Sequence, residues 1–359
     1  MKKIVLLDTS YPINNRNTKI LLSLSGFERF VITWNRDNRM VAANENWTEF
    51  FYTAAVPYGD LFGKLMKMFS YSSYIKKRLN QIKPDCIIAS HWPMLVTAAL
   101  IKPKGVKLVY ENLDIPTAGS GIVLHILRLI ERMALKKADC ILLASRFYKD
   151  LYSFYRRPVH VIENKPFRTA LTDKAARFFH DSDRLKISFI GTLRYFDCMR
   201  NLIIAADNLP IDVLFFGEGR DYQLLYDFSK EYANVYFFGQ YDYEDIKCIY
   251  DLSDIVWAVY PNKDYNVKYA ISNKFFESLV FEKPAVFADG TELGRFVVDQ
   301  NIGFAVDPYK TDAIRNYFLK ILNDKNILPD KIADIKKYNS LNSLYWDDYI
   351  QSLNELFSK

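Results

Sequence analysis

Residues Tyr269 to Ala288 read YAISNKFFESLVFEKPAVFA, a pattern that predicts a loop, a short helix, a turn and a strand. Ser272 is expected to cap the helix by accepting a hydrogen bond from a free backbone N–H. Pro284 stops the helix before the apolar run 285–288. An apolar face at helical spacing should contact a core, and its members are Phe275, Phe276, Leu279 and Val280. This segment therefore predicts a helix packed against a sheet.

Lys274 and Glu277 share the other face of this predicted helix. Lysine before glutamate is the weaker order for a helical ion pair, and a cation in the first turn opposes the helix dipole. Free N–H groups, the dipole and a lysine together form a phosphate site, and a carboxylate one turn later could accept hydrogen bonds from two ribose hydroxyls. The alternative is a solvated ion pair on a surface helix. Both interpretations remain open from these residues alone.

The composition indicates a chain of two domains, because 359 residues with 50% hydrophobic content can form two ordinary cores. Lys and Arg number 48 against 42 Asp and Glu, and the excess is spread along the chain. This disfavours a dedicated nucleic-acid binder but allows a basic face toward an anionic membrane. The four cysteines and four histidines show no paired spacing, so we expect free thiols in a reducing compartment and no metal site.

The start of the chain, MKKIVLLD, has an apolar run too short for a signal peptide and suited to a first strand. No uncharged apolar run approaches the length of a membrane span. We therefore expect a cytoplasmic protein, soluble or peripheral on the inner face of the cell membrane.

The first half alternates strand-like and helix-like segments and predicts a doubly wound α/β domain over residues 1–166. A helix is expected over 121–137, with Leu124, Leu127, Ile130, Glu131 and Leu135 on its buried side. The strands should be Ile4–Leu7, Phe30–Trp34, Cys86–Ser90, Lys107–Tyr110, Cys140–Ala144 and Val159–Asn164. Ligands should bind at the carboxyl ends of these strands. Polar residues follow four of these apolar runs: Asp8-Thr9-Ser10, Trp34-Asn35-Arg36, Ser90-His91-Trp92 and Glu111-Asn112-Leu113-Asp114.

The pattern starts again after a polar stretch that ends near Arg184, which predicts a second doubly wound domain over 167–337. Helices are expected around 201–208, 223–231 and 243–252. The strands should be Ile187–Ile190, Val213–Phe216, Val235–Phe238, Ile255–Val259, Ala285–Ala288 and Gly303–Val306. Residues 338–359 carry apolar side chains on one helical side and predict a closing helix that crosses back to the first domain.

Glycines follow three strands of the second domain, as Gly191-Thr192, Gly217-Glu218-Gly219 and Gly239-Gln240. A single glycine at a strand end is usually a tight turn, and none of these forms a dinucleotide or P-loop pattern. Three in series at one edge of a sheet indicate a place where a ligand can approach the backbone. Arg194 and Arg200 add cations on the same side, although each alone could be a solvated surface arginine.

Taken together, FIGTLRYF (189–196), FFGEGRD (215–221), NVYFFGQYDYEDIKCIYDLSDI (234–255) and YAISNKFFESLVFEKPAV (269–286) resemble the donor-binding half of GT-B glycosyltransferases. The resemblance is to the family-4-like (group 1) bacterial enzymes that build surface polysaccharides. It extends more weakly into the first half through PDCIIASHW (84–92), VYENLDIP (109–116), KKADCILLAS (136–145) and VIENKP (161–166). It implies a GT-B fold, in which two Rossmann-like domains face a central cleft.

The resemblance also implies a role for each matching residue. Gly191, Thr192 and Arg194 would lie against the donor phosphates, and Gly217 and Gln240 would line the base pocket. Ser272, Asn273 and Lys274 would hold the pyrophosphate, and Glu277 the ribose. Backbone N–H groups and these cations would replace a metal ion, so no metal or other cofactor is expected.

This sequence departs from the family pattern at three places. Tyr269 stands where retaining members carry a first glutamate, Asn14-Asn15-Arg16-Asn17 replaces a glycine pair, and Asp197 replaces a lysine. The stereochemistry of transfer is therefore open. An inverting reaction needs a base on the acceptor side, for which we choose Asp114, with Glu111 and His91 behind it. Asp114 could equally form an Asx turn or helix cap before Pro116, and His91 a structural hydrogen bond.

Residues Leu61 to Leu79, LFGKLMKMFSYSSYIKKRL, form a basic amphipathic segment rich in aromatic residues. Such a segment can lie on an anionic bilayer, or it can be an ordinary covering helix of the first domain.

The expected activity is metal-independent transfer of a sugar, hexosyltransferase-like, from a nucleotide diphosphate sugar to a glycan or lipid-linked saccharide. The donor is expected to be a UDP-sugar, and the pathway capsule or exopolysaccharide synthesis in a bacterium. A nucleotide-sugar epimerase of the same fold and a catalytically degenerate nucleotide-binding or scaffold subunit are the alternatives. No nucleic-acid partner is expected.

Overall fold

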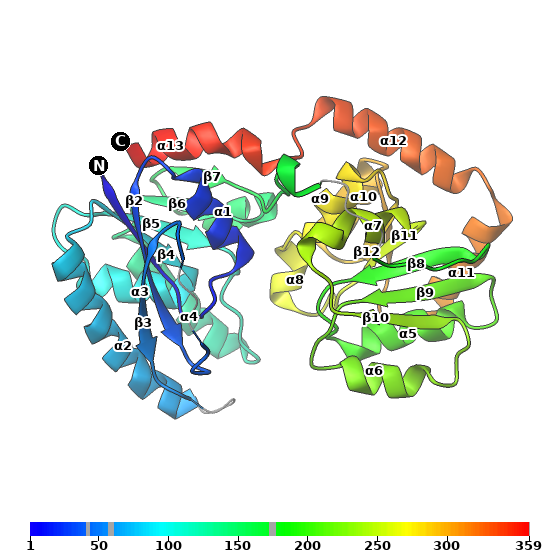
Figure 1. Cartoon of the computed structure of the whole chain (residues 1–359), viewed down its shortest axis with the longest axis horizontal. Coiled ribbons are helices and arrows are strands. Elements are labelled where there is room, and N and C mark those ends of the chain that lie inside the picture. Colours follow the sequence, from blue (N-terminus) through cyan, green and yellow to red (C-terminus); the bar gives the residue numbers. More distant parts are fainter. Residues whose placement is uncertain (41–43, 57–60, 172–176, 359) are drawn as a thin grey trace. The chain divides into compact units, whose positions relative to one another are not determined.

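A computed structural model describes residues 1–40, 44–56, 61–171 and 177–358, without the side chains of residues 61, 62, 64, 65, 170 and 171. The chain separates into two compact units, Met1–Glu163 with Asp348–Lys359, and Asn164–Asp347. Each unit is built on one parallel sheet (Figure 1). Asn164, Lys165 and Pro166, which the sequence assigns to the first domain, belong to the second unit.

The sheet of the first unit has the strand order β3-β2-β1-β4-β5-β6-β7, with all neighbours parallel. Parallel strands buried on both faces are near-continuous apolar runs, and Ile4 to Leu7 are completely buried. The strands are β1 (Lys3–Leu7), β2 (Glu28–Asn35), β3 (Thr48–Thr53), β4 (Cys86–Ser90), β5 (Lys107–Asn112), β6 (Cys140–Leu143) and β7 (Val159–Val161). The sequence predicted all of these except β3, and it placed the end of β7 three residues too late, at Asn164.

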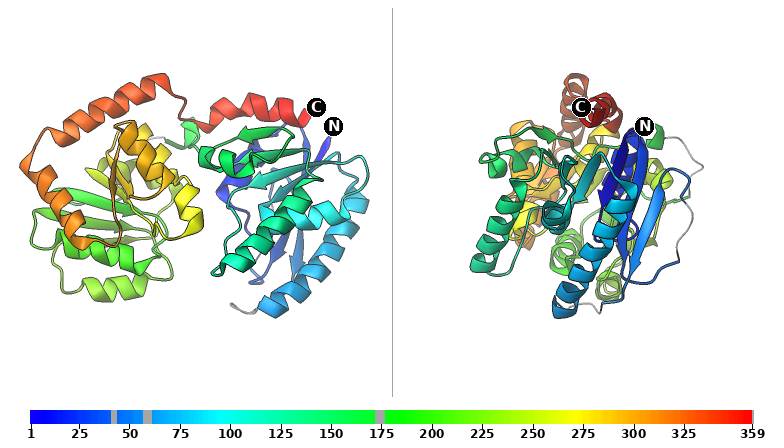
Figure 2. Two further views of the ribbon diagram at one scale, coloured as in Figure 1. Left: turned by 180° about the vertical axis from the view of Figure 1, so that it is seen from behind. Right: turned by 90° about the vertical axis from the view of Figure 1, so that its left-hand side faces the viewer.

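Two layers of helices cover this sheet. The right-handed crossovers that follow β3, β4 and β5 place α2 (Leu61–Ile82), α3 (His91–Ile101) and α4 (Gly121–Leu135) on one face, where Figure 2 shows them side by side. α1 (Asn15–Ser23) returns in the opposite direction and packs against α13 (Ile350–Ser358). η1 (Arg146–Tyr152) connects β6 with β7.

The sheet of the second unit has the order β10-β9-β8-β11-β12-β13, also parallel throughout. α5, α6 and α11 lie on one face, and α7, α9 and α10 on the other. The strands are β8 (Leu185–Ile190), β9 (Ile211–Phe216), β10 (Val235–Gly239), β11 (Ile255–Ala258), β12 (Ala285–Ala288) and β13 (Phe304–Val306). The helices are η2 (Arg168–Leu171), α5 (Phe196–Ala206), α6 (Tyr222–Ser229), η3 (Tyr243–Asp245), α7 (Ile246–Asp251), α8 (Tyr265–Tyr269), α9 (Asn273–Val280), α10 (Glu292–Asp299), α11 (Thr311–Asn323), α12 (Ile327–Leu341) and η4 (Trp346–Tyr349), whose last two residues belong to the first unit.

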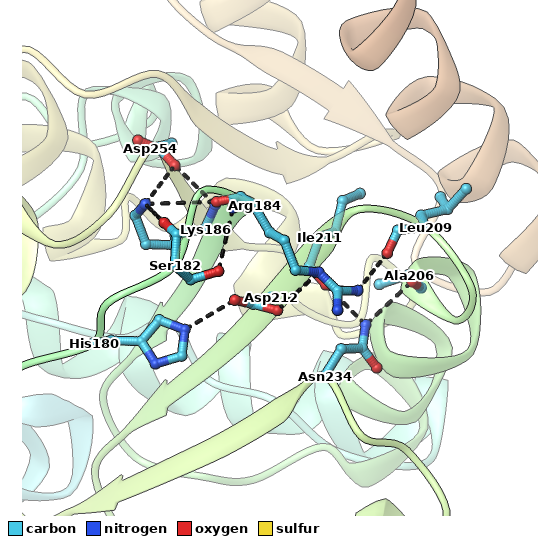
Figure 3. A network of polar contacts seen from close by, with 10 residues as sticks. All are labelled: His180, Ser182, Arg184, Lys186, Ala206, Leu209, Ile211, Asp212, Asn234 and Asp254. Carbon is cyan, nitrogen blue, oxygen red and sulfur yellow. Dashed lines mark hydrogen bonds and ion pairs between the residues drawn. The ribbon is translucent and has the colours of Figure 1, made fainter.

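A polar network fastens the segment before β8 to the amino edge of this sheet (Figure 3). Asp212, which is buried in β9, is 2.9 Å from His180 Nε2 and 3.2 Å from Arg184 Nε. The Arg184 guanidinium also donates to the carbonyl oxygen of Leu209 at 2.6 Å. A buried carboxylate with two basic partners thus holds the entry to the second sheet.

Residues 338–359 do not form the single closing helix that the sequence predicts, although Asp348–Lys359 belong to the first unit, as predicted. α12 ends at Leu341, and α13 begins only at Ile350. Asn342 donates to the carbonyl of Tyr338 at 2.9 Å, and Asn339 donates to that of Leu279 at 2.7 Å. The Asn342 side chain thus competes with the backbone N–H groups for the Tyr338 carbonyl at the point where α12 ends.

In the part of the chain that the structure describes, no helix is long and apolar enough to cross a membrane. The four cysteines are free thiols; Cys248 is half-buried and the others are buried.

Candidate functional site

Helix α9 forms as its sequence predicts. Ser272 adopts an extended backbone conformation, and its hydroxyl accepts from the backbone N–H of Lys274 at 3.3 Å. The helix ends at Val280, and Glu282, with φ at +54°, turns the chain into β12. At the other end, Tyr269 closes the short helix α8, which the sequence analysis had treated as a loop.

The Lys274–Glu277 pair is buried. Lys274 Nζ lies 2.7 Å from Glu277 Oε2, and the two residues are 9% and 3% exposed. The solvated surface pair, one of the two open interpretations, is therefore wrong. α9 packs against β11, β12 and α12, and the burial of Lys274 and Glu277 shows that its polar side faces protein as well as its apolar side.

Tyrosines of the segment 241–250 surround this pair. The Tyr250 hydroxyl donates to Glu277 Oε2 at 3.0 Å, the same oxygen that accepts from Lys274. Tyr243 also lies beside Glu277, and Tyr241 beside Lys274. One carboxylate oxygen therefore accepts from an ammonium and a phenol in a buried setting, where such bonds are strong.

The electrostatics of the site keep the lysine charged. Burial by itself lowers the pKa of Lys274, but the Glu277 carboxylate and the side chains of Tyr241 and Tyr260 together raise it by more, so the pKa lies above its ordinary value of 10.5. Burial, followed by the Glu277 charge, raises the pKa of Tyr250 well above 10.0. The site thus holds a fixed cation at the start of a helix, which suits an anionic ligand.

Three glycine-bearing strand ends lie next to one another at this edge. The N–H of Gly191 donates to the carbonyl of Phe216 at 2.8 Å, and that of Gly217 to the carbonyl of Gly239 at 2.7 Å. A Cβ at Gly217 would lie 2.0 Å from the Gly191 oxygen, so the close approach of these strands requires glycine. A Cβ at Gly191 would lie 3.8 Å from Lys274 Cε. The structure therefore brings this glycine edge to the start of α9.

The other residues predicted for the donor site lie on the surface. The Arg194 guanidinium lies 5.0 Å from the ring centre of Tyr195, and Thr192 is exposed. Gln240 is exposed, and Asn273 accepts from the side chain of Asn164 at 2.9 Å.

In the first unit, Asp114 and Glu111 lie in opposite settings. Asp114 is exposed in the bend after β5. Glu111 is completely buried and forms an ion pair with Arg16, whose guanidinium also donates to the carbonyl oxygen of Ile162. Arg16 lies in the first turn of α1, which Asn14 caps. This is the stretch in which the glycosyltransferases that the sequence resembles carry a glycine pair. Glu111 therefore contributes to a packed interior.

His91 lies close to a buried carboxylate. It begins α3 with φ at +65° and is half-buried. Asp8, at the end of β1, accepts from Asn17 at 2.8 Å and from the Ser10 hydroxyl at 3.0 Å. Burial raises the pKa of Asp8, and the charge of His91 opposes this rise. The strand-end clusters around Asp8 and His91 thus meet at one edge of the first sheet.

Sequence reasoning missed the tyrosines around Glu277 and the contact between Asn17 and Asp8. The signal for the tyrosines was present, since QYDYEDIKCIY places three of them within 241–250. The segment is distant from α9 in the chain, however, and only the fold joins the two. Among the described residues, no three His, Cys, Asp or Glu side chains gather in a way that could hold a metal ion.

No family model and no curated protein matches this sequence. Solved structures match along the whole chain. Sucrose-phosphate synthase from Thermosynechococcus elongatus has a TM-score of 0.78 at 15% identity, with 100% of this chain and 98% of that chain covered. HepE from Anabaena, in complex with UDP-glucose, has a TM-score of 0.72 at 15% identity and 100% coverage of both chains.

A third match is a trehalose-6-phosphate synthase from E. coli bound with UDP-2-fluoro glucose. Its TM-score is 0.67 at 11% identity, with 98% of this chain and 99% of that chain covered. These structures are GT-B glycosyltransferases, and the two parallel sheets described above match theirs. The chain therefore has the GT-B fold.

Proposed function

We propose that this protein is a glycosyltransferase that moves a sugar from a UDP-sugar to a glycan or lipid-linked saccharide in cell-surface polysaccharide synthesis. The observation that carries the proposal is the buried Lys274–Glu277 pair at the start of α9, beside the glycine edge of the second sheet. The UDP and UDP-glucose bound to proteins of the same fold support the choice of donor.

In the proposed reaction, Lys274 and the first N–H groups of α9 bind the diphosphate, and Arg194 supplies a second cation. Negative charge grows on the nucleoside diphosphate as the sugar leaves. Fixed cations and oriented dipoles stabilise that charge without having to reorganise. Glu277 accepts hydrogen bonds from the ribose hydroxyls. We propose that the reaction needs no metal ion.

On the acceptor side, Asp114 is the proposed base. It is exposed after the carboxyl end of β5, whereas Glu111 is buried against Arg16. A base must reach the acceptor hydroxyl, and exposure meets that condition. Asp114→Asn should abolish most of the transfer while leaving UDP affinity unchanged. Full transfer by this variant would show that another group is the base.

Calorimetry with UDP, GDP and ADP tests the donor site. UDP should bind, and Lys274→Ala and Glu277→Ala should each weaken binding by roughly tenfold or more, since a charge-assisted hydrogen bond contributes about 1.5–3 kcal/mol. Lys331→Ala is the matched control, because Lys331 is a comparably buried lysine (8% exposed) of the second unit that donates to the Asn301 carbonyl. Absence of nucleotide binding, or equal effects of all three substitutions, would overturn the assignment.

Turnover then separates the enzyme from its alternatives. A transferase consumes donor only when an acceptor is present, whereas an epimerase acts on the donor alone. A degenerate subunit would bind UDP but would not turn over, whichever acceptor is supplied.

A further inference from the structure

Helix α4 presents an apolar face to solvent. Six large apolar side chains along the helix are between 38% and 76% exposed: Ile122, Val123, Ile126, Leu129, Ile130 and Met133. The sequence had placed Ile130 on the buried side, and its 38% exposure corrects that prediction. Exposed apolar residues are ordinary when they are scattered, but a contiguous stripe on one helix indicates an interaction surface. We call these six side chains the outer face of α4.

The helix is apolar on two opposite sides. Ala134 and Leu135 are buried, and Leu124 and Leu127 are half-buried. Successive residues of a helix are turned by about 100°. Four members of the outer face therefore fall within an arc of about 60°, on the side away from these buried and half-buried residues, namely Ile122, Ile126, Leu129 and Met133. These four side chains are therefore not an incompletely packed part of the core.

The charges around this face have one sign. Residues 121–137 contain four cations, Arg128, Arg132, Lys136 and Lys137, and one carboxylate, Glu131. Glu131 is buried and accepts from the hydroxyls of Tyr110 and Tyr152 at 2.7 Å each. Its charge is therefore withdrawn from the surface.

The next carboxylate along the chain, Asp139, lies 3.2 Å from Arg157 Nη1 and 3.8 Å from Lys102 Nζ. The Asp139 carboxylate therefore pairs with cations that lie outside α4. Along residues 121–137, the apolar stripe is thus accompanied by four cations and by no exposed carboxylate.

We propose that the outer face of α4 binds the surface of an anionic lipid bilayer. An amphipathic helix with large aliphatic residues and flanking Arg and Lys lies in the plane of such a surface, its apolar side among the acyl chains and its cations among the headgroups. A second copy of the chain fits this face less well, because a symmetric pairing would bring two rows of cations together.

This proposal goes beyond the transferase activity and differs from the membrane contact predicted for residues 61–79. In α2, Met66 and Phe69 are exposed, but Leu61, Phe62, Lys64 and Leu65 lie outside the described side chains. The α2 contact therefore stays a separate prediction. The outer face of α4 is described in full.

Cosedimentation with vesicles of phosphatidylcholine, with and without phosphatidylglycerol, tests the proposal. The protein should bind the anionic vesicles at about 0.1 M NaCl and bind less at about 1 M, where the Debye length falls from about 10 Å to about 3 Å. Ile126→Glu with Met133→Glu should lower the partition coefficient at least about tenfold, since both apolar groups leave the bilayer. Both positions are solvent-exposed, so folding and UDP affinity should not change.

The matched control is Leu224→Glu with Val298→Glu, two similarly exposed apolar positions on α6 and α10. This control should bind vesicles as the unsubstituted protein does. Equal binding to neutral vesicles, no binding to anionic vesicles, or unchanged binding by the α4 variant would overturn the proposal. So would a dimer in light scattering that the α4 substitutions convert to a monomer. Loss of UDP binding alone would count against the proposed function and not against this surface.

Discussion

Replacing Lys274 by methionine removes one charge of a buried pair and leaves the Glu277 carboxylate in place. The pair is joined at 2.7 Å, and Glu277 is 3% exposed. Breaking a buried ion pair from one side costs about 3–5 kcal/mol, because the remaining charge is uncompensated. The second unit spans Asn164–Asp347. At that size, about 3 kcal/mol corresponds to a fall in Tm of roughly 6–12 °C.

One control separates this effect from a simple loss of packing. Lys274→Met with Glu277→Leu should recover most of the stability, since no charge then remains buried.

The stability that Lys274 itself contributes depends on pH only in the alkaline range. Its pKa is raised by folding, so this contribution is complete below the ordinary value of 10.5 and is lost only as pH rises above it. The protein with Lys274 should therefore show no change from this source between about pH 6 and pH 9. Calorimetric unfolding of the three proteins across this range measures the loss in the single variant and tests this pH independence. A single variant whose free energy of unfolding stays within about 1 kcal/mol of the original at pH 7.5 would refute the reasoning.

Three further predictions concern other parts of the fold. Gly217→Ala should destabilise the protein far more than Gly105→Ala, because both have positive φ but only the first would place a Cβ against the Gly191 carbonyl; equal losses in chemical unfolding would contradict this. Asp212→Asn should lower stability by about 1–3 kcal/mol, since His180 and Arg184 lose their buried carboxylate, and an unchanged Tm would show that the network of Figure 3 contributes nothing. Burial raises the pKa of Cys140 to about 11, so this thiol should resist alkylation at pH 8 until the protein is unfolded, as mass spectrometry of the modified protein can establish.

The strands could be predicted because a buried parallel strand is a continuous apolar run. Ile4–Leu7 and Ala285–Ala288 show this pattern, and both are almost completely buried. β3, TEFFYT, escaped prediction because it is a half-buried strand at the edge of its sheet. A strand of this kind shows neither a continuous run nor a clean alternation.

The position of α9 was predictable from the sequence, but the burial of its Lys274–Glu277 pair was not. The cap at Ser272 and the unfavourable order of Lys274 and Glu277 are local features that mark α9. The burial of the pair depends on Tyr250 and its neighbours, which reach α9 only through the fold. α4 shows the same limit, because a helix with two apolar sides does not reveal which side faces the sheet.

The way α9 is held has a consequence for identifying the donor. Six of its eight residues are buried, among them both Lys274 and Glu277. A nucleotide that engages these groups therefore binds the folded second unit and not the unfolded chain. Binding of that kind shifts the folding equilibrium by about 2.7 kcal/mol when the ligand is at 100 times its Kd. Each nucleotide-sugar should thus raise the melting temperature in proportion to the logarithm of its affinity, and a melting screen would rank the donors before any acceptor is known.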